Sequence, residues 1–178
     1  MAKAGPCRRR QQQLTALRPR GWNSYDSSWI IDEAAFLDNA RIMAKRLLPH
    51  GYQGVGAYGF DSIDRWGCPF PDHRRFPSSR GGRGFRPIAD KVHAMGLKFG
   101  IHLMNGISTQ AVNANTPILD VHTILKELER PVVLSISPGT AVTPTLAENI
   151  TQRVDMYRVT GDDWDSWKDV RPHFDVAR

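Results

Sequence analysis

The sequence predicts an α/β fold in which parallel strands alternate with helices, an incomplete (β/α)8 barrel with about four of its eight strands. Three observations support this prediction. Short apolar runs alternate with segments of helical periodicity from Gly21 onward. The 178 residues suffice for one domain with a real core, but a closed barrel takes about 250. Carboxylates and tryptophans follow the last predicted strand, where the active sites of such barrels lie.

Residues 1–20 are predicted to be a disordered basic flank, and residues 21–178 a partial (β/α) barrel domain. The flank carries six basic residues and no acidic one, which accounts for the whole net charge of +6. The remaining 18 basic and 18 acidic residues balance, so no basic face and no nucleic-acid partner are expected. The flank lacks the apolar segment of a secretory signal, and no apolar run is long enough to span a membrane. The compartment is therefore left open.

Neither a metal site nor a cofactor is expected. The two cysteines, Cys7 and Cys68, lie far apart in the sequence. The six histidines show no spacing typical of metal ligands.

Helices are predicted where apolar residues recur at three- and four-residue spacing. Residues 30–48 form the clearest helix, with Ser28 or Asp32 as its N-cap. Further helices are predicted at 85–95, 121–129 and 145–150.

A short strand that runs into a polar loop is predicted at 21–26, and further strands are predicted at 97–103, 132–136 and 156–160. Two strands that the alternation requires are not found. Residues 54–59 are expected to be too glycine-rich for a buried strand, and only a loop separates residues 97–103 from the next helix. Residues 60–84 are expected to form one long loop, a functional segment or a sign that something is missing.

An acidic and aromatic cluster follows the last predicted strand. Asp162, Asp163 and Asp165 alternate there with Trp164 and Trp167. A carboxylate that is partly desolvated beside an indole is suited to act as a general acid. The alternative is an acidic first turn that caps a helix over a core tryptophan.

Three side chains near the ends of other predicted strands are candidates for ligand contact. Trp22 and Tyr25 could stack on the apolar face of a ring, or one or both could pack in the core. His102 could face a ligand, although a single histidine on an apolar strand is more often a hydrogen-bonded core residue.

Four motifs, taken in this order, resemble the melibiase family of retaining α-galactosidases, and most closely its plant-type branch. They are residues 21–26 (GWNSYD), 96–102 (GLKFGIH), 131–137 (PVVLSIS) and 158–167 (RVTGDDWDSW). The resemblance implies a barrel of TIM type, followed in the family by a small β-sandwich that is not found in this chain. It also implies an α-galactoside as the partner. Terminal α-galactosyl bonds would be hydrolysed with retention by two aspartates, as part of carbohydrate metabolism.

The resemblance also assigns roles to individual residues. Asp162 matches the general acid/base, and Arg158 a substrate-binding arginine. Tyr25 falls where the family places an aromatic ring against the sugar, His102 where it places a tyrosine, and Ser137 where many members carry a pocket-shaping side chain. Trp22 is the remaining candidate for substrate contact.

Parts of the family pattern are expected to be missing. The second strand should lie between Gln53 and Ala57. The fourth strand, which carries the aspartate nucleophile, should lie between Ile118 and Val121. The last two strands should follow Arg178. The chain is therefore expected to be a shortened product of altered splicing or a faulty gene model, without a nucleophile. The alternatives are an inactive carbohydrate-binding remnant and a chain that does not fold stably.

Overall fold

The structure, a computed structural model, describes residues 19–27, 30–58, 62–65, 67–103, 109, 113, 124–125, 127–128 and 131–176. It divides into two compact units, Arg18–Ile118 and a second unit made of Met1–Leu17 with Leu119–Arg178. Each is described below by itself. All but two residues of the predicted flank lie outside the described residues.

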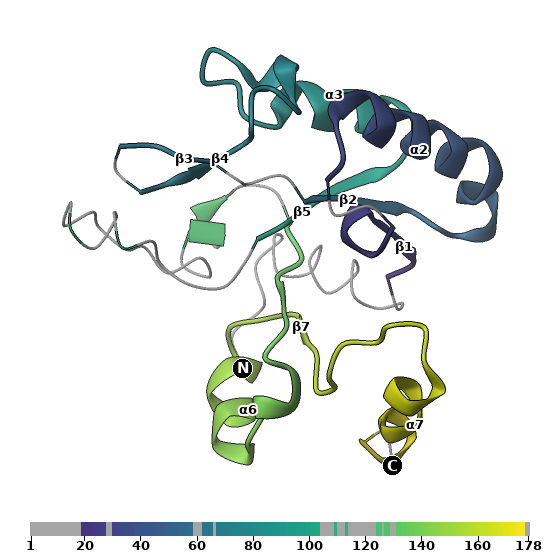
Figure 1. The fold of residues 1–178 in the computed structure, drawn as a ribbon, viewed down its shortest axis with the longest axis vertical. Coiled ribbons are helices and arrows are strands. Elements are labelled where there is room, and N and C mark those ends of the chain that lie inside the picture. The colour runs from purple at the N-terminus through teal and green to yellow at the C-terminus, as the bar shows by residue number, and fades with distance from the viewer. Residues whose placement is uncertain are drawn as a thin grey trace, which may run out of the picture. The chain divides into compact units, whose positions relative to one another are not determined.

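The first unit is built on a three-stranded parallel sheet in the order β1-β2-β5. The strands are β1 (Gly21–Asn23), β2 (Gly54–Tyr58) and β5 (Lys98–His102). Helices α2 (Glu33–Arg46) and α3 (Arg86–Ala94) lie on one side of this sheet (Figure 1). Strands that follow one another in the chain are therefore neighbours in the sheet, as in a barrel, whereas the strand order reverses in a doubly wound sheet.

Strand β2 shows that the prediction of a missing second strand is wrong. It pairs in parallel with β1 on one side and β5 on the other. Val55 and Ala57 alternate onto the face that the helices cover, and they are 2% and 0% exposed. Gly54 and Gly56 fall on the opposite face, where the strand needs no side chain for its packing against the helices.

The core lies between this sheet and its two helices. Helix α2 begins at the Asp32 cap, whose Oδ1 accepts a hydrogen bond of 2.8 Å from the Ala35 backbone N–H. Of the two predicted caps, Asp32 is thus the one for which the structure shows this bond. The buried apolar residues are Ile31, Phe36, Leu37, Ala40, Met43, Val55, Ala57, Phe76, Ile88, Val92 and Leu97.

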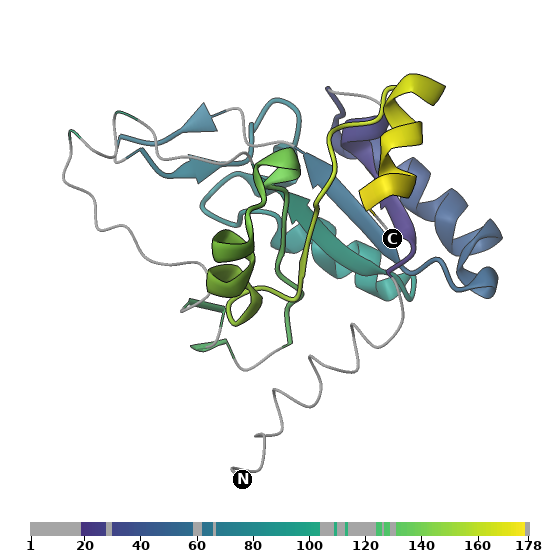
Figure 2. The same ribbon diagram turned by 90° about the horizontal axis from the view of Figure 1, so that it is seen from below.

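The prediction of one long loop at 60–84 is also wrong. Strands β3 (Ser62–Ile63) and β4 (Pro69–Phe70) form an antiparallel hairpin that projects away from α2 (Figure 1 and Figure 2). The 3-10 helix η3 (Pro77–Ser79) follows, and Phe76 beside it is fully buried, with its ring 5.0 Å from that of Phe85. This segment is therefore anchored in the core.

A buried carboxylate, Glu33, ties this segment to both helices. Its oxygens accept a hydrogen bond of 2.9 Å from the Ser78 backbone N–H and lie 3.2 Å from the Lys91 ammonium. Burial by itself would raise the pKa of Glu33, but the hydrogen bond from the Ser78 backbone N–H and the hydrogen bond and charge of Lys91 outweigh it, so the pKa lies below its ordinary value. The charged form of Glu33 thus stabilises the fold.

Replacement of Glu33 by glutamine is expected to lower the free energy of unfolding by about 1–3 kcal/mol at neutral pH, because charge-assisted bonds are lost. The loss should shrink as the pH falls through the lowered pKa, since Glu33 is then protonated in the parent chain as well. Urea titrations at several pH values measure both effects. Asp38→Asn is the control: its pair with Arg41 on α2 is exposed, and about 0.5 kcal/mol or less is expected. Equal losses in the two variants would contradict the account.

The second unit contains one strand–helix–strand repeat. Strands β6 (Ser135–Ile136) and β7 (Met156–Tyr157) pair in parallel. Between them lie η4 (Gly139–Ala141) and α6 (Pro144–Thr151), and α7 (Trp167–Val176) follows β7. The predicted strands and the short helix of this region are confirmed, with shorter strands than expected. The predicted helix at 121–129 lies largely outside the described residues, as does the position of the fourth strand.

The described residues thus hold five parallel strands in two open sheets, β1-β2-β5 and β6-β7, and no closed barrel. The predicted number of strands was too low because β2 was missed. No helix in the described part of the chain is long and apolar enough to cross a membrane.

Candidate functional site

In the first unit, Tyr25 and His102 lie side by side near the carboxyl ends of β1 and β5. Strand β1 ends at Asn23 and runs directly into the 3-10 helix η1 (Ser24–Asp26), which carries Tyr25. The ring centroids of Tyr25 and His102 are 5.2 Å apart, with their planes at 54°. His102 Nδ1 also lies 3.3 Å from the side-chain nitrogen of Asn23. The two candidates, 77 positions apart in the sequence, are thus brought together at the end of the sheet where barrels place their ligands.

Trp22 has the contacts of a core residue. Its ring lies 5.9 Å from that of Phe36 on α2, and its indole N–H donates a hydrogen bond of 3.0 Å to the Ser27 hydroxyl. Because side chains alternate along a strand, Trp22 and Asn23 point to opposite faces of the sheet. Of the two roles considered for Trp22, stacking on a ligand ring and packing in the core, these contacts favour packing in the core.

In the second unit, Arg158 and Asp162 form an ion pair just after β7. The Arg158 backbone N–H donates to Ile136 O at 3.0 Å, which fixes the start of the segment to β6. The Arg158 guanidinium pairs with the Asp162 carboxylate through Nη1, and the two side chains are 39% and 55% exposed. Among the described residues, the buried Arg158 Nε–H has no hydrogen-bond partner. A buried donor of this kind is costly, and its partner can be a ligand oxygen.

The surroundings of Asp162 differ from the expected ones. Trp164 is 55% exposed, so its indole does not bury the carboxylate, and the neighbouring charge is the Arg158 guanidinium. The alternative of an aspartate cap over a core tryptophan does not fit either. At the start of α7 the Ser166 hydroxyl accepts a hydrogen bond of 3.2 Å from the Lys168 N–H, and Trp167 is 67% exposed.

Ser137 directly follows β6 and is exposed. The turn that it begins lies beside the arginine, because a Cβ atom built on Gly139 would be 3.5 Å from Arg158 Nη2 and 3.4 Å from Thr160 O. Gly139 has a φ of +61°, which favours glycine. Ser137, Arg158 and Asp162 therefore belong to the adjacent loops that follow two paired strands.

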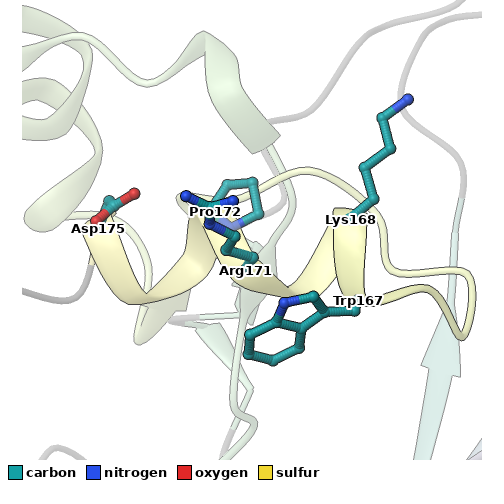
Figure 3. Close-up of a pocket in the computed structure, with 5 residues that line it drawn as sticks. All are labelled: Trp167, Lys168, Arg171, Pro172 and Asp175. Atoms are coloured by element: carbon teal, nitrogen blue, oxygen red, sulfur yellow. The ribbon is translucent and has the colours of Figure 1, made fainter.

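A hollow of about 480 Å³ lies along α7 and holds none of the predicted site residues. All its lining residues come from this one helix: Trp167, Lys168, Arg171, Pro172 and Asp175 (Figure 3). Ligand sites usually gather polar groups from several elements, so we do not assign it as the functional site. Within the described ranges, no cluster of three or more histidine, cysteine or acidic residues could hold a metal ion.

Asn23 is the residue of this region that the sequence analysis missed. It is both the N-cap of η1 and a neighbour of His102. An asparagine at the end of a predicted strand, before a polar turn, was the available signal. Its contact with a residue 79 positions away left no trace in the sequence.

No protein-family model matches the sequence, and no curated protein matches it. Several solved structures match the chain. A GH27 β-L-arabinopyranosidase from Geobacillus stearothermophilus matches 93% of this chain at a TM-score of 0.79 and 26% identity. An Asp-to-Ala form of that enzyme, in complex with arabinose, matches at 0.79 and 27%. A protein assigned as an α-N-acetylgalactosaminidase, from Bacillus halodurans, matches 57% of this chain at 0.51 and 37%.

The chain spans 58% of the length of the arabinopyranosidase and 27% of that of the second protein. Its structural neighbours are thus glycosidases, of family GH27 in the case of the arabinopyranosidase, and they support a glycoside hydrolase relationship at the family level.

Proposed function

We propose that this chain is related to the melibiase-type glycoside hydrolases, that it recognises terminal α-galactosyl groups, and that Asp162 occupies the position of the general acid/base, although its own hydrolytic activity is expected to be negligible. The observation that carries the proposal is the similarity of 93% of the chain to a GH27 glycosidase. The four sequence motifs support the finer assignment to the plant-type branch. The proposed domain comprises residues 21–178, preceded by the basic flank.

The sugar in the name of the arabinopyranosidase and the proposed α-galactosyl group are stereochemically related. A β-L-arabinopyranoside has the ring configuration of an α-D-galactopyranoside and lacks only the hydroxymethyl group. The arabinose complex of the neighbour therefore supports a ligand of this configuration for the present chain. An L-arabinopyranoside is the second candidate ligand.

The proposed roles follow from the contacts in each unit. Asp162 would protonate the oxygen of the departing group and later accept a proton from water, as the acid/base of a retaining glycosidase does. Arg158 would hold a sugar hydroxyl, and its unpartnered Nε–H supports this role. In the first unit, taken by itself, Tyr25 would offer its ring to the apolar face of a sugar and His102 would offer a polar edge. Trp22 would support this arrangement from the core. In the second unit, Ser137 would shape the loop after β6.

The proposal includes the loss of the nucleophile. In the family the nucleophile lies on the fourth strand. The resemblance places that strand between Ile118 and Val121, outside the described residues. In the described part of the second unit, two carboxylates near Asp162 and the strands have partners of their own. Asp163 lies 3.3 Å from His173 Nε2, and Asp155 accepts a hydrogen bond of 2.8 Å from the Leu134 N–H. We therefore expect the chain to bind its sugar but to hydrolyse it negligibly.

Binding can be measured by ligand-observed NMR with methyl α-D-galactopyranoside, L-arabinose and methyl α-D-glucopyranoside. The first two are expected to bind. The glucoside, which inverts the C4 hydroxyl, should bind about tenfold more weakly, since one good hydrogen bond is lost. Arg158→Ala should weaken binding, whereas Arg153→Ala, an exposed arginine of the same unit, should not. Equal binding of galactoside and glucoside, or an unaffected Arg158→Ala variant, would overturn the proposal.

A further inference from the structure

We propose that Asn23 is a positioning residue that holds His102 in one tautomer. The imidazole then carries its proton on Nε2 and presents that edge as a hydrogen-bond donor. The inference rests on the proposed function only for the ligand, a sugar hydroxyl oxygen. The tautomer follows from the contacts of Asn23 alone.

The orientation of the Asn23 amide is set by a backbone group. The Tyr25 N–H can only donate, and it lies 3.1 Å from Asn23 Oδ1. The side-chain nitrogen of Asn23 must therefore face the other way, where His102 Nδ1 lies at 3.3 Å. A flipped amide would place two N–H groups against each other at Tyr25.

The tautomer of His102 follows from this orientation. An amide NH2 group has two donors and no acceptor, so its partner must accept. His102 Nδ1 can accept only if it carries no proton, and a neutral imidazole with a bare Nδ1 has its proton on Nε2. Asn23 thus selects the tautomer whose donor edge is Nε2.

The sheet leaves room for this contact across its central strand. Asn23 on β1 is in register with Gly56 on β2, and His102 on β5 with the end of β2. A Cβ atom built on Gly56 would lie 3.6 Å from Asn23 Cγ, an ordinary van der Waals distance, so the Asn23 amide packs over Gly56. The Tyr25 ring, 5.2 Å away, limits rotation of the imidazole. The ring is thus held by a hydrogen bond and by packing.

A fixed donor edge has a chemical consequence for the ligand. The Nε2–H group of His102 can engage the lone pairs of a sugar hydroxyl, whereas the opposite tautomer would present a bare nitrogen there. If His102 populated both tautomers, binding would have to select one of them, at a cost in binding free energy. Asn23 removes that cost before the ligand arrives.

The experiment is 15N NMR of the histidine ring nitrogens in the sugar-free chain at neutral pH, with His102 assigned from a His102→Gln spectrum. The parent chain should show a protonated Nε2 and a bare Nδ1. In Asn23→Asp, one carboxylate oxygen still caps the Tyr25 N–H and the other accepts where the amide donated, so Nδ1 should gain a proton. Asn39→Asp is the matched control, because this exposed amide on α2 bonds Ala35 O, and His102 should not respond.

A protonated Nδ1 in the parent chain, or a His102 unchanged by Asn23→Asp, would overturn the inference. If the Asn23→Asp variant does not fold, the parent spectrum decides alone. Added methyl α-D-galactopyranoside should shift the Nε2 resonance more than that of Nδ1, and the reverse order would count against the ligand part. Because the tautomer is observed without sugar, failure of the proposed function is distinguishable from failure of this inference.

Discussion

Turnover of 4-nitrophenyl α-galactoside by this chain is expected to be slower than that of an ordinary glycosidase by on the order of 10³-fold or more. A retaining glycosidase needs two carboxyl groups about 5 Å apart, one as nucleophile and one as acid/base. In the proposed assignment Asp162 is the acid/base, and its neighbour Asp163 lies 3.3 Å from His173 Nε2. Loss of one member of such a pair removes most of the catalysis, because the two act in concert.

The matched variant is Asp162→Asn, which should leave this residual rate unchanged. The assay separates three results. Negligible turnover in both chains agrees with the account. Turnover on the order of 1 to 10³ s⁻¹ that Asp162→Asn abolishes would show that the chain holds a nucleophile after all. The same turnover with an unaffected variant would contradict the assignment of Asp162 as well.

Replacement of Gly21 by alanine is expected to destabilise the first unit by about 3 kcal/mol. An alanine Cβ at this position would lie 2.4 Å from the carbonyl oxygen of Gly54 and 2.9 Å from its carbon. Both are backbone atoms of the neighbouring strand, so no side chain can turn aside and the pairing of β1 with β2 must open. Urea denaturation followed by circular dichroism measures the loss.

Gly100→Ala is the control for this substitution. It lies in the same sheet, where the nearest atom to its built Cβ is Val55 O at 3.8 Å, an ordinary contact. A change within about 1 kcal/mol is expected, since an added methyl group also lowers the entropy of the unfolded chain. Equal losses at Gly21 and Gly100 would show that close approach of β1 to β2 is not the cause.

The helices and outer strands could be predicted because they pack through one face. In α2, Phe36, Ala40 and Met43 recur at helical spacing, and that is the face that is buried. Strand β2 was not predicted because residues 54–59, taken together, contain many glycines. Only Val55 and Ala57 pack against the helices, so only those two positions needed side chains.

The segment at 60–84 could not be predicted from periodicity. Its strands are two residues long and its helix is a single 3-10 turn, so no period can develop. Its order depends on contacts distant in the sequence, such as that of Glu33 with the Ser78 N–H, 45 positions away. Such contacts appear only once the chain has folded.

The candidate site was predictable where a motif carried it. Arg158 and Asp162 were assigned from one motif, and the structure pairs them four positions apart. Trp22 remained ambiguous because only the position of α2 decides which face of β1 is the core, and Tyr25 because it lies on η1, beyond the end of the strand. Asn23 was missed because its partner lies on a strand that is not adjacent to its own.

The central claim, that the residues after β7 contribute to a site for a galactose-configured sugar, is tested most directly by a residue-resolved 1H–15N NMR titration with methyl α-D-galactopyranoside. The account predicts shifts at the amides of Arg158 and Asp162, and weaker shifts with methyl α-D-glucopyranoside at the same concentration. Shifts confined to the exposed face of α7 around Trp167, or no shift with either sugar, would contradict it.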